Sequence, residues 1–245
     1  MNPTTTETNA RIDLAAALRW AAKLGFGEGI CNHFSMALPG EDDRFLINPQ
    51  GFHWSEVTPA DLVIVDAHGR KVTGGHDVEP TAFFIHGAIH RGKPGARCVL
   101  HTHMPYATTL TTLQDGRLEW ASQTSLKFYD RVAYDDAYNG LALDEAEGDR
   151  MCAELKDAEV LFLGNHGVIV TGKTIAEAFD DLYYLERACQ LQVMAMQTGR
   201  PLRVVPREIA AMTGRQMAGE SQQPLLHFEA LKRMLDRDEP GWRGN

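Results

Sequence analysis

Apolar residues recur every three or four positions in several long stretches of the chain, and this spacing is typical of amphipathic helices. Residues 10–24 carry the first such stretch, which a glycine-rich segment ends. Further helices are predicted at 81–90, 107–113, 144–155 and 174–198, and the region 206–236 is also rich in helix-forming residues. Asp144 and Thr174 each precede a glutamate by three positions, which is the pattern of a capping box at a helix N-terminus.

Shorter runs rich in β-branched and aromatic residues lie between these helices and predict strands. They cover 33–38, 44–47, 62–66, 98–104, 161–163 and 168–170. Turn-forming residues separate the first three strands, so we expect these to pair as antiparallel neighbours. Segment 114–140 shows neither the helical spacing of three or four residues nor the alternation of a strand, and it carries several aromatic residues. We therefore predict a long connection there, and a connection of that length within a compact domain usually has a function.

Two histidines stand at the end of the predicted strand 98–104. His101 and His103 are two positions apart, so their side chains project from the same face of an extended strand. Pro105 follows and ends the strand. Such a pair fits two ligands of a divalent metal, because zinc binds imidazole nitrogen at about 2.0–2.1 Å. The pair alone also fits two solvated histidines at a strand end.

A third histidine occupies a turn between two apolar strands. His166 lies between Gly164 and Gly167, and we expect the glycines to permit the sharp turn. The turn could be a hairpin tip that merely contains a histidine. Together with the pair at the end of strand 98–104, however, it predicts a three-histidine site for a divalent metal. Zinc fits best and manganese is an alternative, since imidazole sites accept several metals.

The predicted helix 81–90 carries two more histidines, four positions apart. His86 and His90 could bind metal together, but no glutamate follows the first of them, so the metalloprotease pattern is absent. We expect these two side chains to have a core or surface role.

The composition restricts the class of protein. The chain has 245 residues, of which 44% are hydrophobic and 23% charged, as in an ordinary globular protein with a substantial core. Its net charge of −9 argues against binding to nucleic acid. No apolar run reaches the length of a membrane span. The N-terminus lacks the basic and apolar regions of a secretory signal, so we expect a cytoplasmic protein.

The cysteines and the chain ends complete this description. The four cysteines are far apart and are predicted to be buried free thiols, namely Cys31, Cys98, Cys152 and Cys189. We predict a flexible tail at 1–8, one domain at 9–205 and a helical C-terminal extension at 206–245. The extension is expected to be an exposed tail or an arm that packs on a neighbouring subunit.

Three stretches together resemble the class II aldolase/adducin family, which includes L-fuculose-phosphate aldolase and ribulose-phosphate 4-epimerase. These stretches are 97–106, 164–172 with the helix that follows, and 30–51. The resemblance covers residues 10–200. It implies an α/β fold of three layers, α/β/α, with a central, largely antiparallel sheet. It also implies a homotetramer with active sites between subunits. The metal ligands that it implies are His101, His103 and His166.

The chain departs from this family at the position of the acid/base carboxylate. The aldolases carry a glutamate there and the epimerase an aspartate, whereas this chain has Ala82. A methyl group neither ligates a metal nor moves a proton. The usual aldolase mechanism is therefore not expected, and the small side chain would leave room for a planar ring.

The family's phosphate contacts are also altered. Its two serines correspond to Pro80 and Thr81, and its Thr-Gly element corresponds to Gln50 and Gly51. A sugar phosphate is therefore an unfavourable substrate. The residues that stay candidates for substrate binding are Asn32, Gln50, Gly51 and Thr81.

The remaining chemistry is that of a metal-dependent carbon–carbon lyase. A Lewis-acidic metal stabilises the enolate formed in decarboxylation or retro-aldol cleavage, and some members of the family decarboxylate non-phosphorylated acids, including a pyridine-dicarboxylate. We expect a small keto or hydroxy acid as substrate. The candidate catalytic residues are His33, Glu79 and Tyr134, of which Tyr134 lies in the region that supplies a tyrosine to the neighbouring site in the aldolases. The alternatives are a non-catalytic, adducin-like interaction domain and a sugar-phosphate aldolase or epimerase.

Overall fold

The computed structural model describes residues 6–41 and 43–244, and in this part of the chain one sheet of eight strands forms the centre. The strands are β1 (His33–Ala37), β2 (Arg44–Ile47), β3 (Val63–Asp66), β4 (Lys71–Thr73), β5 (Cys98–Thr102), β6 (Val132–Asp135), β7 (Val160–Leu163) and β8 (Gly167–Gly172). Their order across the sheet is β4-β3-β2-β1-β5-β8-β7-β6. All neighbours pair antiparallel except β6 and β7. The largely antiparallel sheet expected from the sequence is therefore confirmed.

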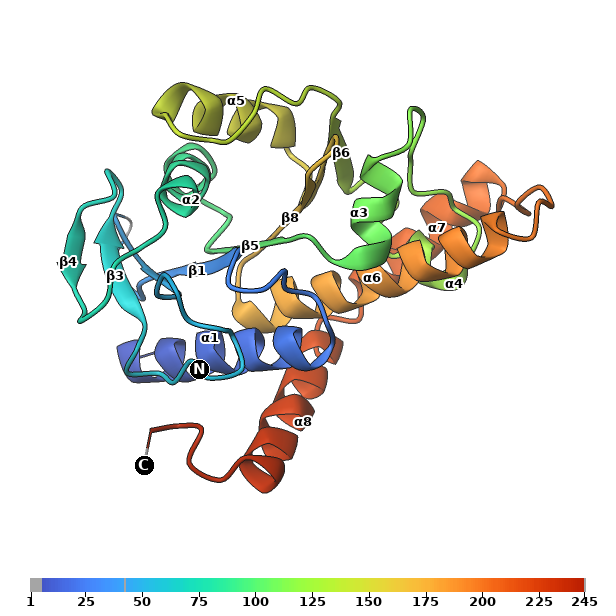
Figure 1. Cartoon of the computed structure of the whole chain (residues 1–245). Coiled ribbons are helices and arrows are strands. Elements are labelled where there is room, and N and C mark those ends of the chain that lie inside the picture. Colours follow the sequence, from blue (N-terminus) through green and yellow to red (C-terminus); the bar gives the residue numbers. More distant parts are fainter. Residues whose placement is uncertain (1–5, 42, 245) are drawn as a thin grey trace.

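Helices cover both faces of this sheet. They are α1 (Glu7–Lys23), α2 (Pro80–Gly92), α3 (Pro105–Thr111), α4 (Gln123–Leu126), α5 (Glu145–Leu155), α6 (Ile175–Met196), α7 (Arg207–Ala218) and α8 (Gln223–Asp238). Figure 1 shows α2 and α5 on one side of the strands, and α1 and α6 on the other. This arrangement confirms the three-layer α/β/α fold. Within the described residues, no helix combines the length and the apolar character needed to cross a membrane.

The alternation of side chains along the central strands separates two cores. Phe34 of β1 and Leu100 of β5 are fully buried in the larger core, with residues of α1 and α6. Val99 of β5 and Ile169 of β8 point to the opposite face and pack with residues of α2 and α5. Because side chains alternate with a period of two, His33 and its neighbours at odd positions of β1 also face α2.

Two predicted segments differ in the structure. Helix α1 begins inside the predicted tail 1–8, because the hydroxyl of Thr6 accepts the backbone N–H of Asn9 and caps it; residues 1–5 lie outside the described part. Segment 114–140 is not an unstructured connection, since it contains α4 and strand β6. Strand β6 is only four residues long and its apolar pattern is weak, so its parallel pairing with β7 could not be read locally.

The C-terminal extension packs on its own chain. Helix α8 lies against α6 and α1, and Trp20 of α1 donates its Nε1–H to the carbonyl of Leu231. Arg19 pairs with Glu239 at 2.6 Å. The extension is thus neither a free tail nor solely an arm for a neighbouring subunit. The expectation of four buried thiols is also corrected, because Cys31 is exposed and Cys152 is only partly buried.

Candidate metal centre

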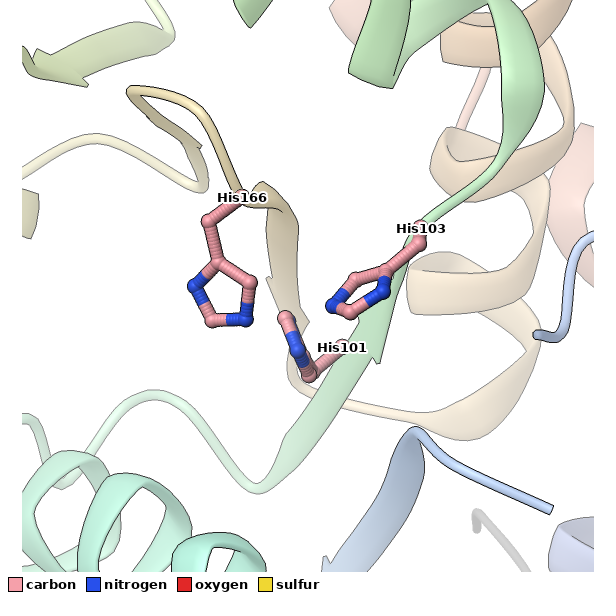
Figure 2. A group of neighbouring side chains, drawn as sticks. All are labelled: His101, His103 and His166. Carbon is pink, nitrogen blue, oxygen red and sulfur yellow. The ribbon is translucent and has the colours of Figure 1, made fainter. Parts of the chain in front are cut away.

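The three predicted ligands converge at one end of β5. His101 lies in β5 and His103 follows directly after it, while His166 projects from the turn between β7 and β8 toward them (Figure 2). One ligand atom from each side chain lies within 4.8 Å of the others. The ring centroid of His166 is 4.8 Å from the ring centroid of His101 and 4.8 Å from that of His103. Strand pairing therefore brings together residues that are more than sixty positions apart in the sequence.

Close packing explains why glycines flank the third histidine. The left-handed residue of the turn is Asn165, with φ 56°, and not one of the glycines. A Cβ at Gly167 would lie 2.5 Å from the carbonyl oxygen of Thr102 and 2.7 Å from Cδ2 of His103. A Cβ at Gly164 would meet the backbone of Asp136 at 3.1 Å. The glycines thus permit close approach of the backbone to the site, which corrects the expectation that they provide the turn conformation.

Hydrogen bonds orient two of the imidazoles. His101 donates its Nδ1–H to the carbonyl oxygen of Val168 at 3.0 Å, and His103 Nδ1 lies 2.5 Å from a carboxylate oxygen of Glu28. Both bonds place the hydrogen on Nδ1 and leave the lone pair on Nε2 for a metal. Nε2 of His103 is buried and has no partner among the described residues. An unpartnered buried acceptor of this kind is what a metal ion would satisfy.

The protonation states also fit a metal. Burial, followed by the neighbouring histidines, lowers the pKa of His101 well below its usual value. Burial and the adjacent His103 lower the pKa of His166 to about 4. Both rings are therefore neutral at neutral pH, the form that binds metal without first releasing a proton.

His33 lies beside the three ligands on β1. It pairs with His101 in the sheet register, and the two ring centroids are 5.1 Å apart. Its Nε2 faces Glu79, whose carboxylate oxygen is 3.5 Å away, and its side chain is 6% exposed. The structure thus brings together two of the three predicted catalytic residues next to the three histidines.

Glu79 caps helix α2. Its carboxylate accepts the backbone N–H of Ala82 at 2.9 Å and the hydroxyl of Thr81. Burial raises the pKa of Glu79, but the hydrogen bonds from His33, Thr81 and Ala82 outweigh it and bring the pKa to about 2. The carboxylate is therefore ionised at neutral pH and suits an orienting role better than the role of proton donor.

Tyr134 lies on β6, and its contacts are with residues outside the three-histidine site. Its ring stacks on Phe162, its hydroxyl accepts the N–H of Leu118 at 3.0 Å, and the guanidinium of Arg117 lies 4.4 Å from its ring centroid. Burial raises its pKa to about 12. The structure does not bring Tyr134 to the histidines of its own chain. The aromatic ring from this region that approaches them is Tyr138, 6.5 Å from His166.

The candidate substrate-binding residues lie around His33 and Glu79. Asn32 has φ 80° and is buried, and its Oδ1 accepts the N–H groups of Glu28 and His103, while its Nδ2 has no partner among the described residues. Gln50 and Gly51 are exposed in the loop after β2, where Gln50 donates its N–H to Asp77. Thr81 is held by the carboxylate of Glu79.

Ala82 does not border open space. It is 1% exposed and packs with apolar residues of β2 and β3, including Phe45 and Val63. The expectation that its small side chain leaves room for a planar ring is therefore wrong. The turn of α2 that faces the site instead carries His86, which contacts His33.

Two contributions to the site were not found in the sequence. Glu28 stands alone between glycines, and nothing local indicates that its carboxylate reaches His103. Ser35 is a single polar residue in an apolar strand, and its contact with α2 depends on how β1 packs. The period of two along β1 was the available signal for Ser35, because it places the hydroxyl on the same face as His33.

Several known proteins are similar to this chain in sequence and in fold. Residues 12–193 match the model of the Class II Aldolase and Adducin N-terminal domain. Decarboxylase NovR of Streptomyces niveus is 33% identical over 91% of this chain and 84% of its own length. A crystal structure of an aldolase II superfamily protein from Pseudomonas syringae has a TM-score of 0.91 at 36% identity, covering 99% of this chain and 98% of that one. L-fuculose 1-phosphate aldolase from Glaciozyma antarctica has a TM-score of 0.84 at 25% identity, over 95% and 92% of the two chains.

Proposed function

Because the chain belongs to the class II aldolase and adducin family, we propose that it is a divalent-metal-dependent carbon–carbon lyase acting on a small, non-phosphorylated keto or hydroxy acid. The observation that carries this proposal is the set of three convergent imidazoles, two of which are oriented by hydrogen bonds. His101, His103 and His166 would hold the ion, with zinc favoured and manganese an alternative. When bound, such an ion acts as a Lewis acid toward a carbonyl or carboxylate oxygen.

The residues beside the ligands suit cleavage of a bond next to a carbonyl. When such a bond breaks, its electron pair stays on the substrate carbon as an enolate, and carbon dioxide or an aldehyde leaves. That carbon must then receive a proton. His33 is the predicted catalytic residue placed to hold this proton at Nε2, since this nitrogen faces the site and Glu79. The ionised carboxylate of Glu79 would orient the ring, and Asn32 Nδ2 is a free donor for a substrate oxygen.

A non-phosphorylated acid fits these surroundings better than a sugar phosphate. Two carboxylates contact histidines of the site: Glu28 contacts His103 and Glu79 contacts His33. Their negative charge disfavours a phosphate dianion nearby. The position of the family's acid/base carboxylate is the buried Ala82. A relative at 33% identity is named a decarboxylase, which supports decarboxylation as one form of the reaction.

We also propose that the protein acts as a homotetramer in the cytoplasm. Apolar side chains such as Leu191, Met194 and Leu226 are about half exposed or more, and burial against another copy would remove them from water. In such an assembly Tyr134 could serve a site only through the neighbouring subunit. A non-catalytic, adducin-like role is the competing proposal, and the oriented imidazoles argue against it.

The test is a screen of metal-loaded protein against keto acids, hydroxy-aromatic acids and L-fuculose 1-phosphate, with release of carbon dioxide and of aldehyde measured. We expect turnover of an acid that stops when His166→Ala removes the metal. We expect His33→Asn to keep the metal and to lose about 10²-fold or more in kcat. His68→Asn, which changes an exposed histidine in a turn, is the control. Absence of stoichiometric metal, or faster turnover of the sugar phosphate than of any acid, would overturn the proposal.

A further inference from the structure

A chain of buried polar groups runs from the site into the layer between β1 and α2. His33 Nδ1 lies 3.1 Å from His86 Nε2, and His86 Nδ1 lies 2.5 Å from the hydroxyl of Ser35. The same hydroxyl lies 2.8 Å from His90 Nε2. All four side chains are buried, with residue exposures between 0% and 9%. Such groups cost about 1–3 kcal/mol each when unpartnered, so a complete chain is needed to keep them inside the protein.

The chain constrains where each hydrogen lies. A neutral imidazole has one donor and one acceptor nitrogen, and a hydroxyl has one hydrogen to donate. His86 uses both nitrogens and Ser35 has two imidazole neighbours, so every hydrogen in the chain, including that of Ser35, has a partner only when all of them point in one direction. The three histidines therefore carry their hydrogens either all on Nδ1 or all on Nε2.

The end of the chain at the site selects the direction. His33 Nε2 faces the carboxylate of Glu79, which is ionised and can only accept a hydrogen bond, so the hydrogen of His33 is on Nε2. His33 Nδ1 then accepts from His86 Nε2, and His86 Nδ1 accepts from the Ser35 hydroxyl. The Ser35 hydroxyl in turn accepts from His90 Nε2. Burial lowers the pKa of His86 well below its usual value and that of His90 to about 3, so both rings are neutral.

We propose that Ser35, His86 and His90 are positioning residues that fix the ring of His33 with its Nδ1 lone pair on His86 and its hydrogen on Nε2, which faces Glu79 and the site. The role of this nitrogen in turnover rests on the proposed function, but the hydrogen position does not. The chain starts at a residue paired with His101 in the sheet and ends on helix α2, so it ties the ring to two rigid elements. Figure 1 shows α2 lying over β1, the two elements that the chain connects.

The experiment locates these hydrogens directly. Long-range proton–nitrogen correlation spectra of the zinc-loaded protein, with ¹⁵N-labelled histidine, distinguish a hydrogen on Nδ1 from one on Nε2. Signals are assigned by their loss in His33→Asn and His90→Gln. We expect Nε2–H for His33, His86 and His90 in the wild type. A hydrogen on Nδ1 of His33 in the unmodified protein would overturn the proposal.

Ser35→Ala breaks the chain at its centre. We expect His33 in this variant to shift toward a mixture with Nδ1–H, and kcat for the acid substrate to fall about 10- to 100-fold with KM nearly unchanged. The control Thr171→Val removes another buried hydroxyl of the sheet, which bonds to Glu159, and should leave His33 unaffected. An unchanged His33 tautomer in Ser35→Ala refutes the positioning role. If no acid is turned over at all, the spectra still decide the tautomer, so failure of the proposed function is distinguishable.

Discussion

Glu28 offers a sharp test of how the site is oriented. Its carboxylate meets His103 Nδ1 at 2.5 Å, although its own side chain is 68% exposed. Glu28→Ala removes this acceptor while the backbone N–H of residue 28 keeps its bond to Asn32. Glu28→Gln retains an amide oxygen as acceptor and removes only the charge. The two variants therefore separate ring orientation from electrostatic attraction.

The expected magnitude follows from the geometry. Hydrogen-bond partners of metal-binding histidines typically contribute 10- to 100-fold to metal affinity. Because the Glu28 carboxylate is largely exposed, solvent screens its charge, so we expect the lower end of this range. Glu28→Ala should weaken zinc binding about 10-fold, or about 1.4 kcal/mol. Glu28→Gln should lose about threefold, since the orienting hydrogen bond persists.

Competition with a chromophoric chelator at neutral pH measures these affinities. The control is Glu7→Ala, which removes an exposed carboxylate that pairs with Arg11 on helix α1. We expect the control to bind zinc as the wild type does. If Glu28→Ala binds zinc within about twofold of the wild type, or Glu28→Gln binds more weakly than Glu28→Ala, the orienting role of this carboxylate is refuted.

Three further substitutions test other parts of the structure. Gly167→Ala places a Cβ 2.5 Å from the carbonyl of Thr102, so metal content and Tm should both fall, whereas Gly95→Ala, with open space around its Cβ, should change neither; retained metal would contradict the packing argument. Burial raises the pKa of Glu186 to about 7 from 4.5, so the stability of the wild type relative to Glu186→Gln should fall by up to about 3 kcal/mol as pH rises from 4.5 to 7; parallel urea-unfolding curves across this range would refute it. Ala82→Glu buries a carboxylate in an apolar cluster and should lower stability by about 3 kcal/mol; an unchanged urea midpoint would show that the side chain reaches water.

The sign of the pH effect at Glu186 follows from proton binding. The unfolded chain releases the Glu186 proton near pH 4.5, whereas the folded protein holds it until about pH 7. Between these values the folded state binds more protons, so raising the pH favours unfolding. The glutamine variant lacks this proton and shows no such dependence at this position. The comparison at two pH values is therefore independent of the hydrogen bond that the amide loses.

The convergence of the three candidate ligands could be predicted from the sequence because their signals are local. A period of two in a strand puts His101 and His103 on one face, and His166 stands in a turn that two apolar strands define. Residue-by-residue correspondence with the family then supplied the pairing of the two segments. Helix boundaries were also predictable where a cap marks them, as at Thr174, whose hydroxyl accepts the N–H of Glu177.

The remaining features depend on packing that no local pattern encodes. The aromatic content of segment 114–140 concealed β6, because four residues, three of them partly exposed, carry almost no periodic signal. Glu28 reaches His103 across 75 positions of sequence. His86 and His90 were expected in a core or surface role, and they are indeed buried, but their bonds to Ser35 follow from the way α2 lies on β1.

The two faces of β1 explain how the site is prepared before anything binds. Phe34 and Met36 turn toward an apolar core, and the positions between them, His33 and Ser35, turn toward α2. Each hydrogen bond on that face contributes only about 1 kcal/mol, yet removing one member leaves its buried neighbours unpartnered at greater cost. The polar face is therefore stable only when complete. The orientation of His33 is consequently set when β1 packs on α2, and a ring fixed by folding requires little reorganisation during the reaction.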